Sequence, residues 1–196
     1  MNEYDAWDAI DNFQPDKALE IWRTLMSKEN NQDKKDSLKS NSCYALLELN
    51  RIDEARKIYL ELFEKYQTHK YLHQLCMVER KANNYNKALY YLNLEKEMIS
   101  PDNTLALSAN LYEFAKLNEL IGNIDKALKL SKDCLSLSLT CDDDIMLACA
   151  NRLLGDVYLK IDIEKAKPYY LKAKNIFANA EDIFAANEID QLMNDL

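Results

Sequence analysis

Glycine and proline are scarce in this sequence, which has two glycines and three prolines among 196 residues. Sheets and sandwiches need many turn residues, whereas long helices joined by tight links need few. The composition is otherwise globular, with 48% hydrophobic and 30% charged residues. The shortage of turn residues therefore favours an all-α fold.

Long apolar runs are also missing. The longest runs, such as Tyr44–Leu47, fall far short of the roughly 18 residues that indicate a membrane span. The N-terminus is acidic and lacks the basic start and apolar core of a signal peptide. We therefore expect a cytoplasmic protein without a membrane partner.

An excess of positive charge is absent too, because the formal net charge is -8. Nucleic-acid binding needs a cationic face, so we expect no nucleic-acid partner. An acidic body suits a basic or apolar partner, although the charge also serves solubility alone. The cysteines are odd in number and contain no Cys-x-x-Cys pair, which indicates reduced core residues in place of a disulfide or zinc framework. They are Cys43, Cys76, Cys134, Cys141 and Cys149.

A short signature recurs along the chain, with an alanine shortly after an acidic or amide residue. Examples are Ile52-Asp53-Glu54-Ala55 and Ile124-Asp125-Lys126-Ala127. Successive alanines are separated by 37, 33, 39 and 39 residues, and the five copies cover nearly the whole chain. Such a period is the sequence sign of a repeat protein. The five alanines are Ala18, Ala55, Ala88, Ala127 and Ala166.

Each signature is typical of a helix start followed by one apolar face. After Ala55 the apolar residues continue at Ile58, Tyr59, Leu62 and Phe63, which is helical spacing. A second apolar pattern lies upstream of each alanine. The predicted helices are 3–12, 15–29, 34–50, 52–66, 69–83, 85–99, 102–121, 124–140, 142–160, 163–178 and 181–195.

The fifth copy reads Leu-Leu-Gly-Asp-Val-Tyr over residues 153–158, with Ala166 eight residues after the tyrosine. An aromatic residue follows the alanine by four positions as Trp22, Tyr59 and Tyr170, while Leu92 and Ser131 stand there in the other copies. This pattern resembles the tetratricopeptide repeat. A small residue also precedes the alanine by twelve positions as Ala6, Cys43, Cys76 and Ala115, and by eleven as Gly155.

The resemblance implies a right-handed superhelical solenoid of about five antiparallel helix-turn-helix repeats in a single domain over residues 1–196. The repeats are expected at 3–30, 34–67, 69–100, 102–140 and 142–179. A C-terminal helix over 181–196 would cover the open end of the stack with Ala185, Ile189, Leu192 and Leu196.

Candidate metal, calcium and phosphate sites all have simpler explanations. His69 and His73 are spaced to share a helix face, but no third histidine exists and Cys76 occupies a repeat position. The acidic run 142–144 lacks the glycine and the final carboxylate of a calcium loop and is typical of a helix start. Phosphate loops need clustered glycines. We expect no catalytic, metal or cofactor site, and hence no enzyme.

In such a stack the first helix of each repeat lines the concave side. Groove residues should lie on first helices, off the packing stripe. Aligning the copies on the small residue predicts Trp7, Asn41, Tyr44, Glu48, His73, Met77, Arg80, Tyr112, Lys116, Glu119, Arg152 and Asp156. These types are common in interface cores. For the aromatic members, ordinary repeat packing is the alternative.

These observations predict a non-catalytic module that binds a protein or peptide in its concave groove, as a scaffold or adaptor. Two alternatives stay open. One is a regulator that senses a short peptide, since the elongated, irregular repeats are similar to those of bacterial peptide-sensing regulators. The other is a dedicated chaperone or immunity-type partner of one protein. The sequence indicates no oligomeric state.

Overall fold

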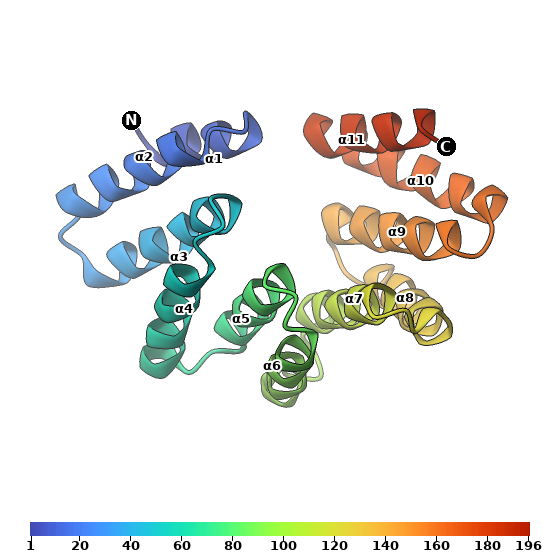
Figure 1. Ribbon diagram of the computed structural model, residues 1–196, viewed down its shortest axis with the longest axis horizontal. Helices are drawn as coiled ribbons and strands as arrows, with labels where there is room; N and C mark the ends of the chain where they lie inside the picture. Colours follow the sequence, from blue (N-terminus) through green and yellow to red (C-terminus); the bar gives the residue numbers. More distant parts are fainter. The chain divides into compact units, whose positions relative to one another are not determined.

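The computed structural model describes residues 1–196 as eleven α-helices with short connections and no strand (Figure 1). This confirms the predicted all-α helical repeat fold. The helices are α1 (Glu3–Asp11), α2 (Pro15–Lys28), α3 (Gln32–Glu48), α4 (Ile52–Tyr66), α5 (His69–Lys81), α6 (Tyr85–Met98), α7 (Thr104–Leu120), α8 (Ile124–Ser138), α9 (Asp144–Leu159), α10 (Ile163–Asn179) and α11 (Ile183–Asn194).

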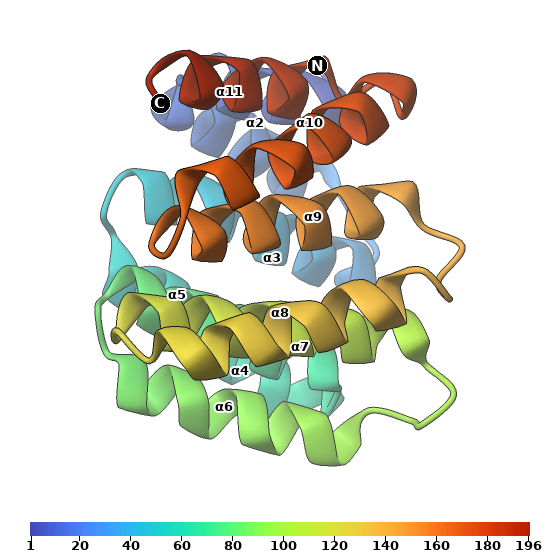
Figure 2. The same cartoon turned by 90° about the vertical axis from the view of Figure 1, so that its right-hand side faces the viewer.

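The helices group into two compact units, Met1–Leu94 and Glu95–Leu196. In the first unit, consecutive helices from α1 to α5 pack against each other. In the second unit, consecutive helices from α7 to α11 do the same, and α7 also contacts α9. Figure 2 shows α9, α10 and α11 following one another in chain order. The prediction of a single repeat domain over 1–196 stays a prediction.

The repeat positions inferred from the sequence form the interior of the helix pairs. All five repeat alanines are fully buried, and so are the residues four positions later, from Trp22 to Tyr170. The small residues of the first helices, Ala6, Cys43, Cys76, Ala115 and Gly155, are buried as well. The positions that recur in the sequence repeat are therefore the positions that are buried between the packed helices.

Because Ala127 packs in this interior, we expect Ala127→Leu to lower the free energy of unfolding by about 1–3 kcal/mol through overpacking. Chemical denaturation followed by circular dichroism measures the change. The matched variant Lys126→Leu alters the neighbouring exposed position and should change stability by less than about 0.5 kcal/mol. Equal stability of Ala127→Leu and the parent would contradict the register.

The two helices of every repeat are joined by three residues. In the first four repeats the middle residue is left-handed, with φ of 56° at Phe13, 56° at Asn50, 59° at Asn83 and 83° at Gly122. The next N–H then donates to the carbonyl five residues back, at 2.8 Å in each case. This is the Schellman arrangement, which satisfies carbonyls at the helix end.

The fifth repeat turns differently. Ile161 stands at the middle position, and its β-branched side chain disfavours positive φ; it is not left-handed here. The N–H of Asp162 donates to the carbonyl of Tyr158, four residues back, at 2.7 Å. In this repeat Gly155 lies eleven residues before its alanine in place of twelve.

Several predicted helix boundaries are wrong by about two residues. The helices predicted from 102, 142 and 181 begin at Thr104, Asp144 and Ile183. The reason is capping: Asn103, Asp143 and Asp182 lie outside the helices, and their side chains accept the N–H groups of Ala106, Met146 and Ala185. The helix predicted from 34 begins earlier, at Gln32, after the cap Asn31.

The C-terminal helix α11 packs on α10. Ala186 and Ile189 are buried against a cluster that includes Tyr170 and Phe177, with Ala185, Leu192 and Met193 partly buried. One detail of the prediction is wrong, because Leu196 lies beyond the last turn and is exposed. Ala186 and Met193 complete the packing face in its place.

Candidate functional site

The first helices of the first unit are linked by aromatic and amide side chains. Trp7 is half-buried and lies edge-on to Trp22 and Tyr44, with centroids 5.1 Å apart in both pairs. Asn41 donates from Nδ2 to Glu3 Oε2 at 3.1 Å. These contacts place the side chains of α1 beside those of α3.

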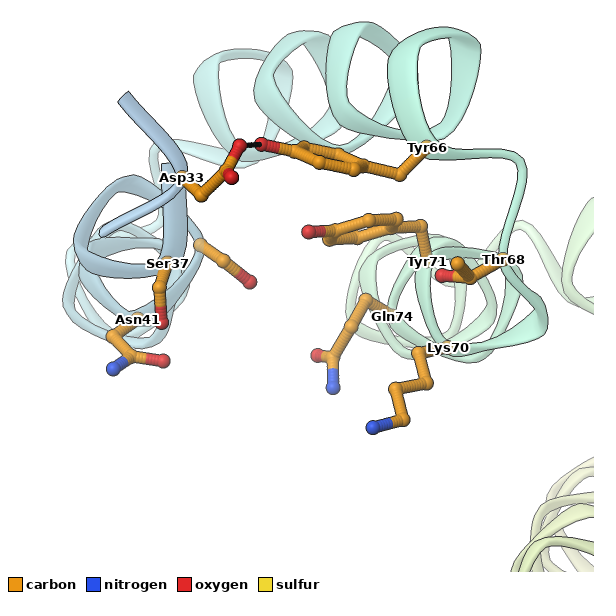
Figure 3. A pocket seen from close by; sticks show the side chains of 9 residues that line it. Asp33, Ser37, Asn41, Tyr66, Thr68, Lys70, Tyr71 and Gln74 are labelled. Atoms are coloured by element: carbon orange, nitrogen blue, oxygen red, sulfur yellow. Dashed lines mark hydrogen bonds between the residues drawn. The ribbon is translucent and has the colours of Figure 1, made fainter. Parts of the chain in front are cut away.

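A polar cavity of about 490 Å³ lies between α3 and α5 (Figure 3). Tyr66 and Tyr71 extend toward α3, with ring centroids 5.9 Å apart. The Tyr66 hydroxyl lies 2.8 Å from Asp33 Oδ1 and 2.9 Å from Asp36 Oδ2. Most of the other lining residues carry hydroxyl or amide groups. The cavity is lined by Asp33, Ser37, Ser40, Asn41, Tyr66, Thr68, Lys70, Tyr71 and Gln74.

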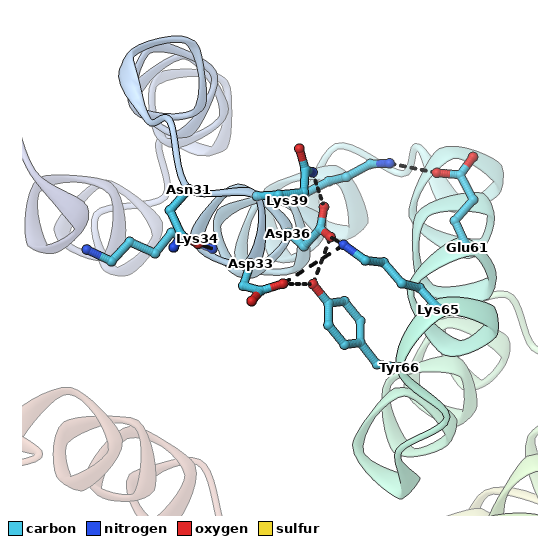
Figure 4. Close-up of polar contacts among 9 residues, drawn as sticks. Asn31, Asp33, Lys34, Asp36, Lys39, Glu61, Lys65 and Tyr66 are labelled. Atoms are coloured by element: carbon cyan, nitrogen blue, oxygen red, sulfur yellow. Dashed lines mark hydrogen bonds and ion pairs between the residues drawn. The ribbon is translucent and has the colours of Figure 1, made fainter.

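Ion pairs behind this cavity fix α3 against α4 (Figure 4). Asp36 is buried and lies 2.6 Å from Lys65 Nζ, and Lys39 lies 2.6 Å from Glu61. Burial alone would raise the pKa of Asp36, but hydrogen bonds from Lys65, Tyr66 and Gln32 outweigh it and hold this pKa below its ordinary value. The ionised Asp36 carboxylate thus takes part in the contacts that hold α3 against α4.

A second cavity, of about 270 Å³, lies further along the same two helices. Its surface is mainly apolar, with cationic groups from the end of α5. Lys81 Nζ lies 3.2 Å from Glu48 Oε1, which joins α3 to α5 on one side. The lining residues are Ile10, Tyr44, Leu47, Glu48, Met77, Arg80 and Lys81.

The two cavities follow one face of each helix, and together we call them the α3–α5 groove. On α3 the lining positions are 33, 37, 40, 41, 44, 47 and 48, and on α5 they are 70, 71, 74, 77, 80 and 81. These are spacings of three and four, so each set forms a stripe. The Gln74 side chain donates to the Tyr44 hydroxyl at 3.4 Å where the cavities adjoin. At 1.5 Å per residue, the stripe on α3 is about 22 Å long.

Most of the groove residues predicted in this unit lie on that stripe. Asn41 lines the polar cavity, and Tyr44, Glu48, Met77 and Arg80 line the apolar one. Trp7 supports Tyr44 from α1. The remaining predicted member, His73, is half-buried and lines neither cavity.

The sequence reasoning missed most of the polar lining. Asp33, Ser37 and Ser40 precede the aligned segment of α3, and on α5 Tyr71 and Gln74 lie two positions and one position from the predicted His73. The helical spacing from Asp33 through Ser37 and Asn41 to Tyr44 was the signal that could have found the α3 members.

The predicted residues of the second unit lie close together but are engaged with carboxylates. Lys116 Nζ lies 2.9 Å from Glu119 and 3.1 Å from Asp156. Arg152 lies 2.6 Å from Glu188. The positive charges of Lys116 and Arg152 are therefore compensated by neighbouring carboxylates.

Tyr112 packs against two core clusters of the second unit, and burial raises the pKa of its hydroxyl. These contacts are of the kind expected for repeat packing, and a role of Tyr112 in the groove stays a prediction. Arg80 belongs to the first unit, so the idea that it shares a surface with Tyr112, Lys116 and Arg152 stays a prediction.

The cysteine environments disfavour thiolate chemistry. Cys43, Cys76 and Cys134 are buried. Burial raises the pKa of the Cys43 thiol to about 12 and those of Cys134 and Cys149 to about 11. Nowhere in residues 1–196 do three or more histidine, cysteine or acidic side chains gather as metal ligands would. No helix has the length and apolar character needed to span a membrane.

Solved structures with a similar fold include helical repeat proteins. BtubC (BKLC) from P. vanneervenii superposes with a TM-score of 0.63 at 18% identity, over 90% of this chain and 78% of that one. The nearly identical TPR-like repeats of a putative kinesin light chain from Podosopora anserina give 0.59 at 11%, over 92% and 94%. A MamA RS-1 double mutant gives 0.53 at 15%, over 90% and 93%.

No protein-family model matches the sequence. No curated protein matches it either. The structural likeness defines the class, which is an all-α helical repeat protein. More particularly, the chain has the TPR-like repeat fold. Folds of this class typically present extended surfaces for protein–protein interaction.

Proposed function

We propose that this chain is a non-catalytic, cytoplasmic protein- or peptide-binding module that holds its partner along the α3–α5 groove. The observation that carries the proposal is the pair of adjoining cavities on one stripe of α3 and one stripe of α5. They combine apolar and aromatic surface with cationic, hydroxyl and amide groups, which is the mixture found in interface cores.

The groove dimensions suit a short extended segment. A stripe of about 22 Å accommodates roughly six or seven extended residues. One apolar side chain would enter the cavity beside Met77 and Leu47, where Arg80 offers a charge-assisted contact. Backbone and polar groups would meet Ser37, Gln74 and the other polar residues of the larger cavity.

The test begins with affinity purification from the native host and mass spectrometry to identify the partner. We then expect Met77→Ala combined with Arg80→Ala to weaken partner binding at least tenfold, or about 1.4 kcal/mol, measured by isothermal titration calorimetry. Both side chains are partly exposed, so the change in melting temperature should be small.

The control is Lys28→Ala combined with Lys57→Ala, which alters exposed residues of the second helices α2 and α4. This control should bind like the parent. Equal affinity of the groove variant and the parent would place the partner elsewhere and end the groove proposal. An adaptor, a peptide-sensing regulator and a dedicated chaperone would each use this surface, and the identity of the partner separates them.

A further inference from the structure

A separate cavity of about 350 Å³ lies in the second unit, across α8, α9 and α10. Figure 2 shows these three helices side by side. Leucine and isoleucine side chains make most of its surface, and Leu139 at the edge is 67% exposed. The cavity is lined by Leu135, Leu139, Leu147, Asn151, Lys172, Asn175 and Ile176.

Two lysines and two tyrosines extend this surface. Tyr158 of α9 and Tyr169 of α10 stack with centroids 5.4 Å apart and planes 10° apart. Lys132 Nζ lies 5.9 Å from the Tyr158 ring, and Lys172 Nζ lies 5.7 Å from the Tyr169 ring. Lys172 also lines the cavity, so the apolar pocket and the tyrosine pair are continuous. We call the whole surface the α8–α10 groove.

The charges around this groove are arranged asymmetrically. Lys132 and Lys172 are exposed, and each contacts an aromatic face without an ion-pairing carboxylate. Elsewhere on α10, Lys165, Lys167 and Lys174 pair with acidic residues. The connection from α8 to α9 next to Leu139 carries Asp142 and Asp143. Lys172 therefore differs from the other three lysines of α10, and the apolar cavity has two lysines beside it that no carboxylate pairs.

We propose that the α8–α10 groove is a second interaction surface, which binds an acidic, apolar segment of a partner protein. A leucine or phenylalanine of that segment enters the leucine-lined cavity. Aspartate or glutamate residues beside it lie toward Lys132 and Lys172. Asp142 and Asp143 repel a segment bound in the opposite direction, so the charge pattern also sets the orientation.

The apolar lining favours a protein segment over a nucleic acid. The cavity offers aliphatic surface to its occupant, and burial of an aliphatic side chain there is favourable because it removes apolar surface from water. Phosphate binding, in contrast, depends on many cations, and only two uncompensated lysines are placed here. The proposal does not depend on the α3–α5 groove, because it uses other helices in the other unit.

The experiment pans a phage-displayed library of random twelve-residue peptides against the intact protein. Enriched peptides are then synthesised with a fluorescent label and their affinity is measured by anisotropy. We expect enriched sequences that place Asp or Glu next to Leu or Phe. Their affinity should fall at least tenfold in Lys132→Glu with Lys172→Glu, and at least tenfold in Leu139→Asp.

The charge-matched control is Lys28→Glu with Lys57→Glu on α2 and α4, which should keep the parent affinity. An equal loss in this control, or no loss in the two groove variants, would overturn the proposal. If the affinity of the enriched peptides falls only when Met77 and Arg80 are replaced, they bind in the α3–α5 groove. That result would overturn the proposal for the α8–α10 groove. A labelled single-stranded DNA 20-mer that displaces the peptide, and whose binding is lost in the lysine variant, would assign the surface to nucleic acid instead.

Discussion

Replacing Tyr170 by alanine is expected to lower the free energy of unfolding by about 4 kcal/mol. The ring is fully buried in the cluster that joins α10 to α11, and removing it leaves a large cavity. Its hydroxyl also donates to Asp156 at 3.0 Å. Urea denaturation followed by circular dichroism gives the value. A loss below about 1 kcal/mol would contradict the burial of the ring.

The Tyr170 ring also determines how a substitution at Gly155 changes stability. A Cβ atom there would lie 2.6 Å from two Tyr170 ring carbons, so Gly155→Ala should cost about 1–3 kcal/mol in the parent. In a Tyr170→Ala background the obstacle is gone. Alanine is the better helix former by about 1 kcal/mol, so the substitution should then be stabilising.

If the effect of Gly155→Ala on stability changes sign when the Tyr170 ring is removed, glycine is needed at this position for packing and not for its backbone conformation. Gly122 is the matched control, because it has φ of 83° and a Cβ atom added there would meet nothing within 4 Å. Gly122→Ala should cost about 1 kcal/mol in both backgrounds, through backbone strain alone. A penalty for Gly155→Ala that is independent of residue 170 would contradict the close approach.

Replacing Glu79 by alanine should lower the free energy of unfolding by about 3 kcal/mol. The side chain is fully buried and lies 2.7 Å from Arg56 Nε, 3.0 Å from Lys87 Nζ and 2.9 Å from Asn84 Nδ2. Removing the carboxylate leaves the largely buried Arg56 guanidinium with only its exposed partner Asp53. Because Glu79 joins α5 to α4, the loss should also displace Arg80 at the groove.

The control is Glu54→Ala, which removes an exposed carboxylate that also pairs with an arginine, Arg51. An exposed pair contributes little, so the free energy of unfolding should change far less than in Glu79→Ala. Equal effects of the two substitutions would contradict the buried network around Glu79.

This network also has a pH signature. Burial alone would raise the pKa of Glu79, but hydrogen bonds from Arg56, Asn84 and Lys87 outweigh it and hold this pKa below its ordinary value. A carboxyl with a lowered folded-state pKa stabilises the protein above its unfolded pKa, about 4.3, and this contribution is lost as the pH falls through the folded value. The stability of Glu79→Gln should therefore fall less steeply below about pH 4.3 than that of the parent.

The repeat interior was predictable from the sequence because it depends on local periodicity. Ala55 and Tyr59 lie four residues apart on one helix face, and both are buried, as are their counterparts in the other copies. The first residues of the helices were predicted less accurately, because a single side chain determines where a helix is capped. Asp143 caps α9 from outside the helix, while Asp144 lies within it, and residue type alone does not separate the two.

The candidate site was harder to predict because it depends on how neighbouring helices face each other. Alignment on the small residue selected His73 on α5, whereas its neighbour Gln74 faces the polar cavity. The ion pairs of Lys116 with Asp156 and of Arg152 with Glu188 could not be predicted either, because in each pair the two residues come from different helices. The α8–α10 groove depends likewise on three helices, and Lys132 and Lys172 are 40 residues apart in the chain.

The buried thiols supply a set of internal reporters. Cys43, Cys76 and Cys134 lie in three successive repeats, on α3, α5 and α8, and each is shielded in the folded state. Repeat proteins open locally as well as globally. Pulsed alkylation followed by peptide mass spectrometry would therefore time the opening of each of these three repeats separately, without an introduced cysteine. The order in which the three thiols react would show from which end the stack frays.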